Sequence, residues 1–233
     1  DVSAVVLLTV GTLLLSLYAL CLVLLRAPVF GTAVYRPMII NIGLSLTPTA
    51  ILIAVLGAMI GITLLAPSAV ALWAVIAVGA AGWLLMLPNS AYLITELNFS
   101  HRDESERVPL WYDIVLVLTL ALSGVFNTLL NLALAQSLYV LVVRPNDDHP
   151  LRHPDSWVMS VVVLVLVTFG MYLGRYIRFN SWDIRHPISF VRKLVGYFAE
   201  RGHVREALGF CTAHSVLLAI LYLIVVAPLV AVL

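Results

Sequence analysis

Charged residues stand at the ends of several long apolar segments of this chain. Glu96, Asp113 and Asp183 are carboxylates, and Arg175 and Arg178 are cations one helical turn apart. Guanidinium groups bind phosphate or carboxylate through paired hydrogen bonds, and a positioned carboxylate can carry a proton. Because ionisable groups are costly inside a membrane unless they are paired, this set predicts a binding or proton-transfer site.

Neutral side chains extend the same candidate site. If a helix continues after Pro88, Asn89 and Tyr92 share one face with Glu96. His214 interrupts the last apolar segment and could titrate or bind a metal. The predicted substrate-binding set is Asn89, Tyr92, Glu96, Asp113, Arg175, Arg178, Asn180, Asp183 and His214.

Several of these residues also have a structural interpretation. Asp113 could cap the helix that it opens, and Glu96 with Arg175 could form a buried ion pair that holds a bundle together. His214 could be a hydrogen-bonded core histidine, and Arg178 an anchor at the membrane surface. These alternatives stay open at the level of the sequence.

No metal site and no cofactor are predicted. Cys21 and Cys211 lie inside apolar runs, without a CxxC pair and without histidine at metal-binding spacing. Both are therefore expected to be free thiols.

Six apolar segments must position the candidate residues. A helix needs about 20 residues to cross a hydrocarbon core about 30 Å thick. The sequence predicts an all-α membrane protein, a single domain over 1–233, with six transmembrane helices and the third broken at Pro88-Asn89. Asn127 and Asn131 are expected to form interhelical hydrogen bonds. The six segments are 2–25, 38–65, 69–87, 114–143, 158–174 and 208–233.

Composition supports the membrane class. The chain is 62% hydrophobic and 11% charged, whereas a soluble domain carries about 25% charged residues. Its formal net charge is +1, so no nucleic-acid partner is expected.

The placement of the basic residues predicts the orientation. When the Lys and Arg residues are counted over alternate loops, eleven fall on one face and two on the other. Cytoplasmic loops carry the excess of positive charge, so both termini are expected outside and the basic loops in the cytoplasm. The expected location is the inner, cytoplasmic membrane.

Two further features concern partners. Apolar residues recur at helical spacing over 187–201, which predicts an amphipathic helix in the cytoplasmic interface that attracts anionic lipid. Gly57 with Gly61 and Gly170 with Gly174 form GxxxG pairs, which favour packing within the chain and, as an alternative, a homodimer. The bilayer itself is the first expected partner.

Three blocks carry a resemblance to a known family. They are LPNSAYLITE at 87–96, PLWYD at 109–113 and YLGRYIRFNSWD at 172–183. In this order they resemble the bacterial membrane family catalogued as domain-of-unknown-function family 1361, in which an acidic residue stands at the position of Glu96. The resemblance covers most of the chain and implies no activity. It implies a shared site, structural or functional, formed by Glu96, Asp113, Arg175, Arg178, Asn180 and Asp183.

Three classes of function remain open. The first is a small transporter or lipid-handling protein that binds an anionic group at Arg175 and Arg178, with Glu96 or Asp113 carrying a proton. A broken third helix fits this class, although no inverted repeat is visible. The second is an intramembrane hydrolase or transferase acting on lipid by metal or acid–base chemistry. The sequence contains no HExxH or GxSxG motif that would support this class. The third is a structural or partner-binding subunit with an internal ion-pair network. The first gives the most concrete mechanism.

Overall fold

The computed structural model describes residues 2–97, 108–147, 153–177 and 187–230, and all regular elements in these ranges are helices. Six of the described segments are long and apolar enough to cross a membrane, as the sequence predicts. The elements are α1 (Val2–Phe30), α2 (Arg36–Leu65), α3 (Ala69–Met86), α4 (Pro88–Tyr92), η1 (Leu93–Leu97), α5 (Leu110–Val143), α6 (Pro154–Tyr172), η4 (Leu173–Ile177), α7 (Pro187–Ala199), α8 (His203–Val225) and α9 (Ala227–Val230).

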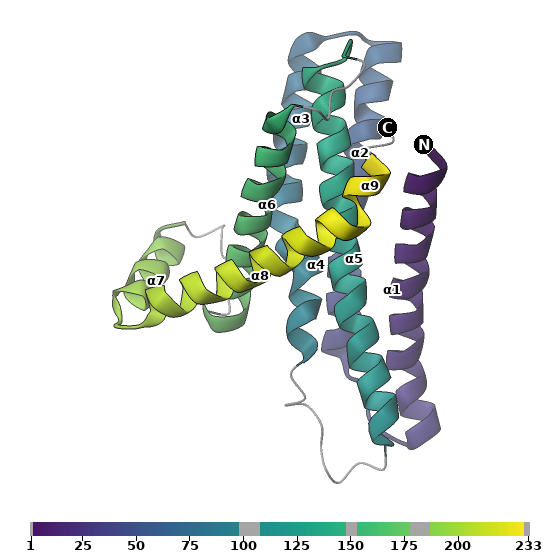
Figure 1. The fold of residues 1–233 in the computed structure, drawn as a ribbon, viewed down its shortest axis with the longest axis vertical. Coiled ribbons are helices and arrows are strands. Elements are labelled where there is room, and N and C mark those ends of the chain that lie inside the picture. Colours follow the sequence, from purple (N-terminus) through teal and green to yellow (C-terminus); the bar gives the residue numbers. More distant parts are fainter. Residues whose placement is uncertain (1, 98–107, 148–152, 178–186, 231–233) are drawn as a thin grey trace.

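Helix α5 is the centre of the bundle, with α1 along one side and α6 along the other (Figure 1). It is 34 residues long, or about 50 Å at 1.5 Å per residue. Gly124 lets α4 and η1 approach it closely, because a Cβ at this position would lie 2.7 Å from the carbonyl oxygen of Ser90. The glycine thus seats the end of the third span against the central helix.

Between α3 and α4 the backbone of the third span keeps helical angles up to Pro88. Leu87, between α3 and α4, has φ −57° and ψ −37°, which are helical values. Its N–H donates to the carbonyl of Trp83 at 2.8 Å, and the following residues tighten into the 3₁₀ turn η1. The third span is thus divided into α3, α4 and η1, and the break expected at Pro88-Asn89 stays a prediction.

A second proline, Pro48, lies inside α2 and removes one backbone hydrogen bond, which the side chain of Thr47 replaces. Pro48 has no N–H to donate to the carbonyl of Leu44. The hydroxyl of Thr47 donates to that carbonyl instead, at 2.7 Å. The helix can therefore run unbroken from Arg36 to Leu65.

Helix α8 crosses the bundle obliquely in Figure 1, and α7 stands to the side of α6. Contacts with α6 and α5 fix α8: Thr168 and Ser215 share a hydrogen bond of 2.8 Å, and Tyr222 donates to Gln136. The expected helix over 187–201 is present as α7, and its position in the membrane interface stays a prediction.

Candidate functional site

A buried polar stripe joins α2 to α5 in the middle of the bundle. Asn131 donates to Thr49 at 2.8 Å, and Asn127 donates to Ser16 of α1 at 3.0 Å. The indole N–H of Trp83 donates to Asn131 at 3.2 Å. All five side chains are buried, so the interhelical bonds expected of the two asparagines are present. With no water in the bilayer to bond these groups, each bond specifies how the helices meet.

Asp113 is buried at the start of α5, where it forms an ion pair with Arg26. The guanidinium Nε of Arg26 lies 3.1 Å from Oδ1 of the carboxylate, and both side chains are largely shielded from solvent. Arg26 also donates to the hydroxyl of Thr32 at 3.3 Å. Next to Asp113, Tyr112 donates to the carbonyl of Leu22 at 2.7 Å. These contacts lock the ends of α1 and α5 together.

Glu96 is buried in η1 with 7% of its surface exposed. Its Oε1 accepts a hydrogen bond of 3.3 Å from the amide of Asn41 on α2. Its Oε2 is buried and has no hydrogen-bond partner among the residues described. The carboxyl group is thus held by one neutral donor and by no described cation.

Arg175 lies in η4, a π-helical turn that follows α6. Its side chain is half-buried, and no acidic residue in the described part of the chain forms an ion pair with it. Tyr176 beside it stacks on Tyr172, with ring centroids 4.5 Å apart, and meets Phe210 of α8 edge-on. π-helical turns are rare and occur frequently at functional sites.

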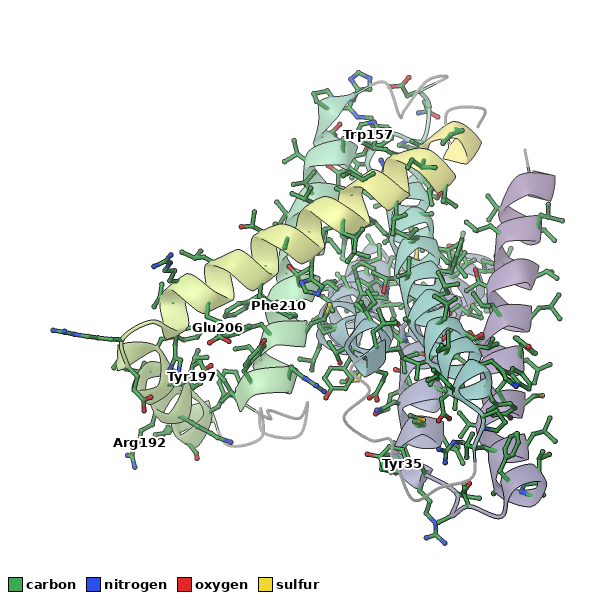
Figure 2. The ribbon with its side chains drawn as sticks, turned by 60° about the horizontal axis from the view of Figure 1, so that its bottom comes forward. Tyr35, Trp157, Arg192, Tyr197, Glu206 and Phe210 are labelled. Atoms are coloured by element: carbon green, nitrogen blue, oxygen red, sulfur yellow. The ribbon has the colours of Figure 1, made fainter. Side chains whose placement is uncertain are left out.

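The aromatic residues around η4 continue into the angle between α7 and α8. Figure 2 shows Tyr197 of α7, with Glu206 and Phe210 of α8, gathered in that angle, whereas Arg192 points away from the bundle. Tyr197 and Tyr172 share a hydrogen bond of 2.9 Å between their hydroxyl groups. The turn that contains Arg175 is therefore flanked by an aromatic cluster that joins η4, α7 and α8.

The remaining described candidates make only local contacts. Asn89 donates to the sulfur of Met86 at 3.7 Å, and Tyr92 is half-buried. His214 is hydrogen-bonded through Nδ1 to the carbonyl of Phe210 and stacks on that ring, with centroids 3.9 Å apart. These contacts fit the structural interpretation of His214.

Three of the predicted site residues lie outside the described part of the chain. They are Arg178, Asn180 and Asp183. Among the residues that are described, no three His, Cys, Asp or Glu side chains lie together as a metal site requires.

The structure pairs the charged residues differently from the expectation based on spacing. Asp113 is paired with Arg26 and Glu96 with Asn41, and no contact in the described chain joins either acid to Arg175. Sequence reasoning counted Arg26 only as a loop cation. The available signal for Asn41 was its place in a stripe with Ser45 and Thr49 at intervals of four residues.

Comparison with known proteins gives a family and no activity. No curated protein and no solved structure matches this sequence. The family described as "Protein of unknown function (DUF1361)" matches residues 40–226, a range that contains Asn41, Glu96, Asp113 and Arg175 and begins after Arg26. The match covers most of the chain and all three of the sequence blocks described above, so this multi-pass membrane protein belongs to the DUF1361 family.

Proposed function

We propose that this integral membrane protein binds an anionic group at Arg175, as a small transporter or lipid-handling protein. The observation that carries the proposal is the state of the Arg175 guanidinium, which is half-buried and has no acidic partner among the described residues. A cation at membrane depth is costly unless a negative group compensates it. A phosphate or carboxylate would supply that charge through two parallel hydrogen bonds.

The local structure suits a bound headgroup. Arg175 lies within the π-helical turn Leu173–Ile177, and the rings of its neighbours in this stretch, Tyr172 and Tyr176, are stacked on each other. Arg178 and Asn180 remain proposed parts of the same site on the basis of their spacing.

Glu96 is the better candidate of the two acids for exchanging a proton or cation with a transported solute. Asp113 already has Arg26 as its counter-ion, whereas Glu96 has only the neutral amide of Asn41. Oε2 of Glu96 has no hydrogen-bond donor among the described residues, so it can accept a proton or bind a cation.

The proposed setting is the cytoplasmic membrane, with both termini outside and Arg175 at the cytoplasmic level. The unequal distribution of Lys and Arg supports this orientation. Anionic lipid of the inner leaflet would then lie beside Arg175, and α7 with exposed Arg192 and Lys193 would lie on the same surface.

Lipid retention tests the anion site. We expect the wild-type protein in mixed micelles to retain phosphatidylglycerol over phosphatidylcholine by roughly tenfold, a factor that corresponds to one charge-assisted contact. Arg175→Gln should lose most of this preference, and Arg205→Gln, a change at an exposed position of α8, should keep it. Native mass spectrometry measures the ratio of bound lipids.

Inorganic phosphate as a competitor separates a headgroup site from a solute site. If phosphate displaces the lipid at millimolar concentration, the site accepts the free anion as well. Unchanged selectivity in Arg175→Gln and in Arg178→Gln would contradict the proposal. The buried hydrogen-bond network would then favour a structural role for the polar residues.

A further inference from the structure

We propose that a second lipid site lies at the opposite end of the bundle. An apolar cavity between α2, α3, α5 and α6 binds one hydrocarbon chain of a zwitterionic lipid, whose ammonium group donates to Asp155 and whose phosphate meets Arg144. This site is independent of the anion site at Arg175 and differs from it in the headgroup that it selects.

The cavity has a volume of about 400 Å³, within the range of about 300–1,000 Å³ that is typical of ligand pockets. Val55 of α2, Trp73 of α3, Leu138 of α5 and Met159 of α6 form its four walls. The lining side chains are apolar except for the hydroxyl group of Tyr139 and the indole N–H groups of Trp73 and Trp83. Trp83 uses its N–H on Asn131, so its indole presents only a ring face or edge to the cavity.

Two close contacts of the third span, one at the cavity and one beyond it, fix the helices that form the walls. Val55 of α2 packs against Gly79 of α3. A Cβ added to Gly79 would lie only 2.2 Å from Val55 Cγ2, so this contact requires glycine. At the other end of the third span, Pro88 packs on Gly170 of α6, where a Cβ would lie 2.4 Å from Pro88 Cγ. The third span is thus fixed on α2 along its length and on α6 near Pro88. The cavity lies beside the first contact, between α3 and the part of α6 that contains Met159 and Val163.

A hydrocarbon chain is the occupant that this lining favours. Apolar cavities stay dry and bind apolar molecules, because water finds no hydrogen-bond partners in them. An empty cavity would leave its lining atoms without dispersion contacts on one side. The walls belong to segments that are long and apolar enough to span a bilayer. The acyl chains of the surrounding lipids are therefore the apolar molecules that can enter the cavity.

Polar groups at one end of the cavity complement a zwitterionic headgroup. Tyr139 lines the cavity, and its hydroxyl donates to Oδ2 of Asp155 at 3.2 Å. Arg144 donates to the same oxygen from Nη2, also at 3.2 Å. The other oxygen, Asp155 Oδ1, is shielded from solvent and has no hydrogen-bond partner in the described part of the protein. A buried acceptor of this kind calls for a donor, which the ammonium of an aminolipid provides.

Both charges of the headgroup then have a partner. The Arg144 side chain is one-third exposed, and a guanidinium group has five N–H donors. Its remaining donors can bind a lipid phosphate while Asp155 binds the ammonium. Phosphatidylcholine has no N–H group and therefore cannot make the contact to Asp155 Oδ1.

A competition between two zwitterionic lipids tests this site. The delipidated protein is incubated in mixed micelles of phosphatidylethanolamine and phosphatidylcholine with identical chains, and native mass spectrometry reports the lipids that remain bound. We expect wild type to retain one phosphatidylethanolamine with roughly tenfold preference. Asp155→Asn should remove the preference, and Glu206→Gln, an exposed change on α8, should leave it intact.

A cavity-filling variant tests the chain and does not alter the headgroup contacts. Ala135 lines the cavity, and Ala135→Phe should remove the tightly retained lipid, whereas Ala213→Phe on the exposed face of α8 should not. Thermal unfolding of each variant in detergent identifies any loss of the fold. Equal retention of the two lipids by wild type, or unchanged retention in a folded Ala135→Phe protein, would overturn the proposal.

Discussion

At the scale of single residues, the ion pair between Arg26 and Asp113 is more buried than the Arg144–Asp155 pair, the other Arg–Asp pair among the described residues. It joins residues 87 positions apart in sequence, and it stands next to the hydrogen bond from Tyr112 to the backbone of α1. Hydropathy could locate Asp113 at a helix start, but no feature of the sequence indicated which arginine would reach it. Pairing depends on how the helices pack, and a charge does not specify its own partner.

Removing one partner of this pair should destabilise the protein strongly. Asp113→Ala leaves Arg26 without its carboxylate in a largely shielded position, at a cost of about 3–5 kcal/mol. The midpoint of thermal unfolding in detergent should fall well below that of Glu200→Ala, which alters an exposed acid. Equal midpoints for the two variants would show that the pair contributes little.

At the scale of elements, apolar length was sufficient to predict six spans. Length and composition require no knowledge of packing, and all six predicted segments overlap spans of the structure. The π-helical turn η4, the oblique course of α8 and the cavity between α3 and α6 could not be predicted in the same way. Each results from contacts between helices that are distant in sequence, such as Tyr222 with Gln136.

Glycine at position 124 should be required for packing of the third span on α5. Gly124→Ala places a Cβ 2.7 Å from the Ser90 carbonyl oxygen, so the backbone must shift, at a cost of about 1–3 kcal/mol. Gly61→Ala is the matched control, because its Cβ would meet nothing within 4 Å. That variant should be neutral or slightly more stable, as alanine favours helix. The prediction is wrong if both variants unfold at the same temperature.

At the scale of the whole molecule, the two ends of the bundle differ in chemistry. Arg26, Arg36, Glu96, Asp113 and Arg175 belong to one end, and the other carries the Arg144–Asp155 pair above the apolar cavity. The two proposed lipid sites would therefore face opposite leaflets. Chain order and hydropathy were enough to separate the ends, and the pairings within each end required the structure.

Cysteine labelling tests the orientation of these two ends. In a protein without Cys21 and Cys211, a membrane-impermeant maleimide applied from outside should modify Asn146→Cys in intact cells. Lys193→Cys should react only after the membrane is opened; both positions are exposed. Labelling of position 193 from outside would reverse the proposed orientation.

The oblique course of α8 also has a consequence for the membrane itself. α8 has 23 residues and α5 has 34, and Figure 1 shows the shorter helix inclined across the longer one. An inclined helix covers less hydrocarbon thickness than an upright helix of equal length. We therefore expect the apolar belt to be thinner on the flank of α8 than on the flank of α1. Such a mismatch would bend the lipid surface on one side only, at the lowest deformation energy where the surrounding membrane is already thin.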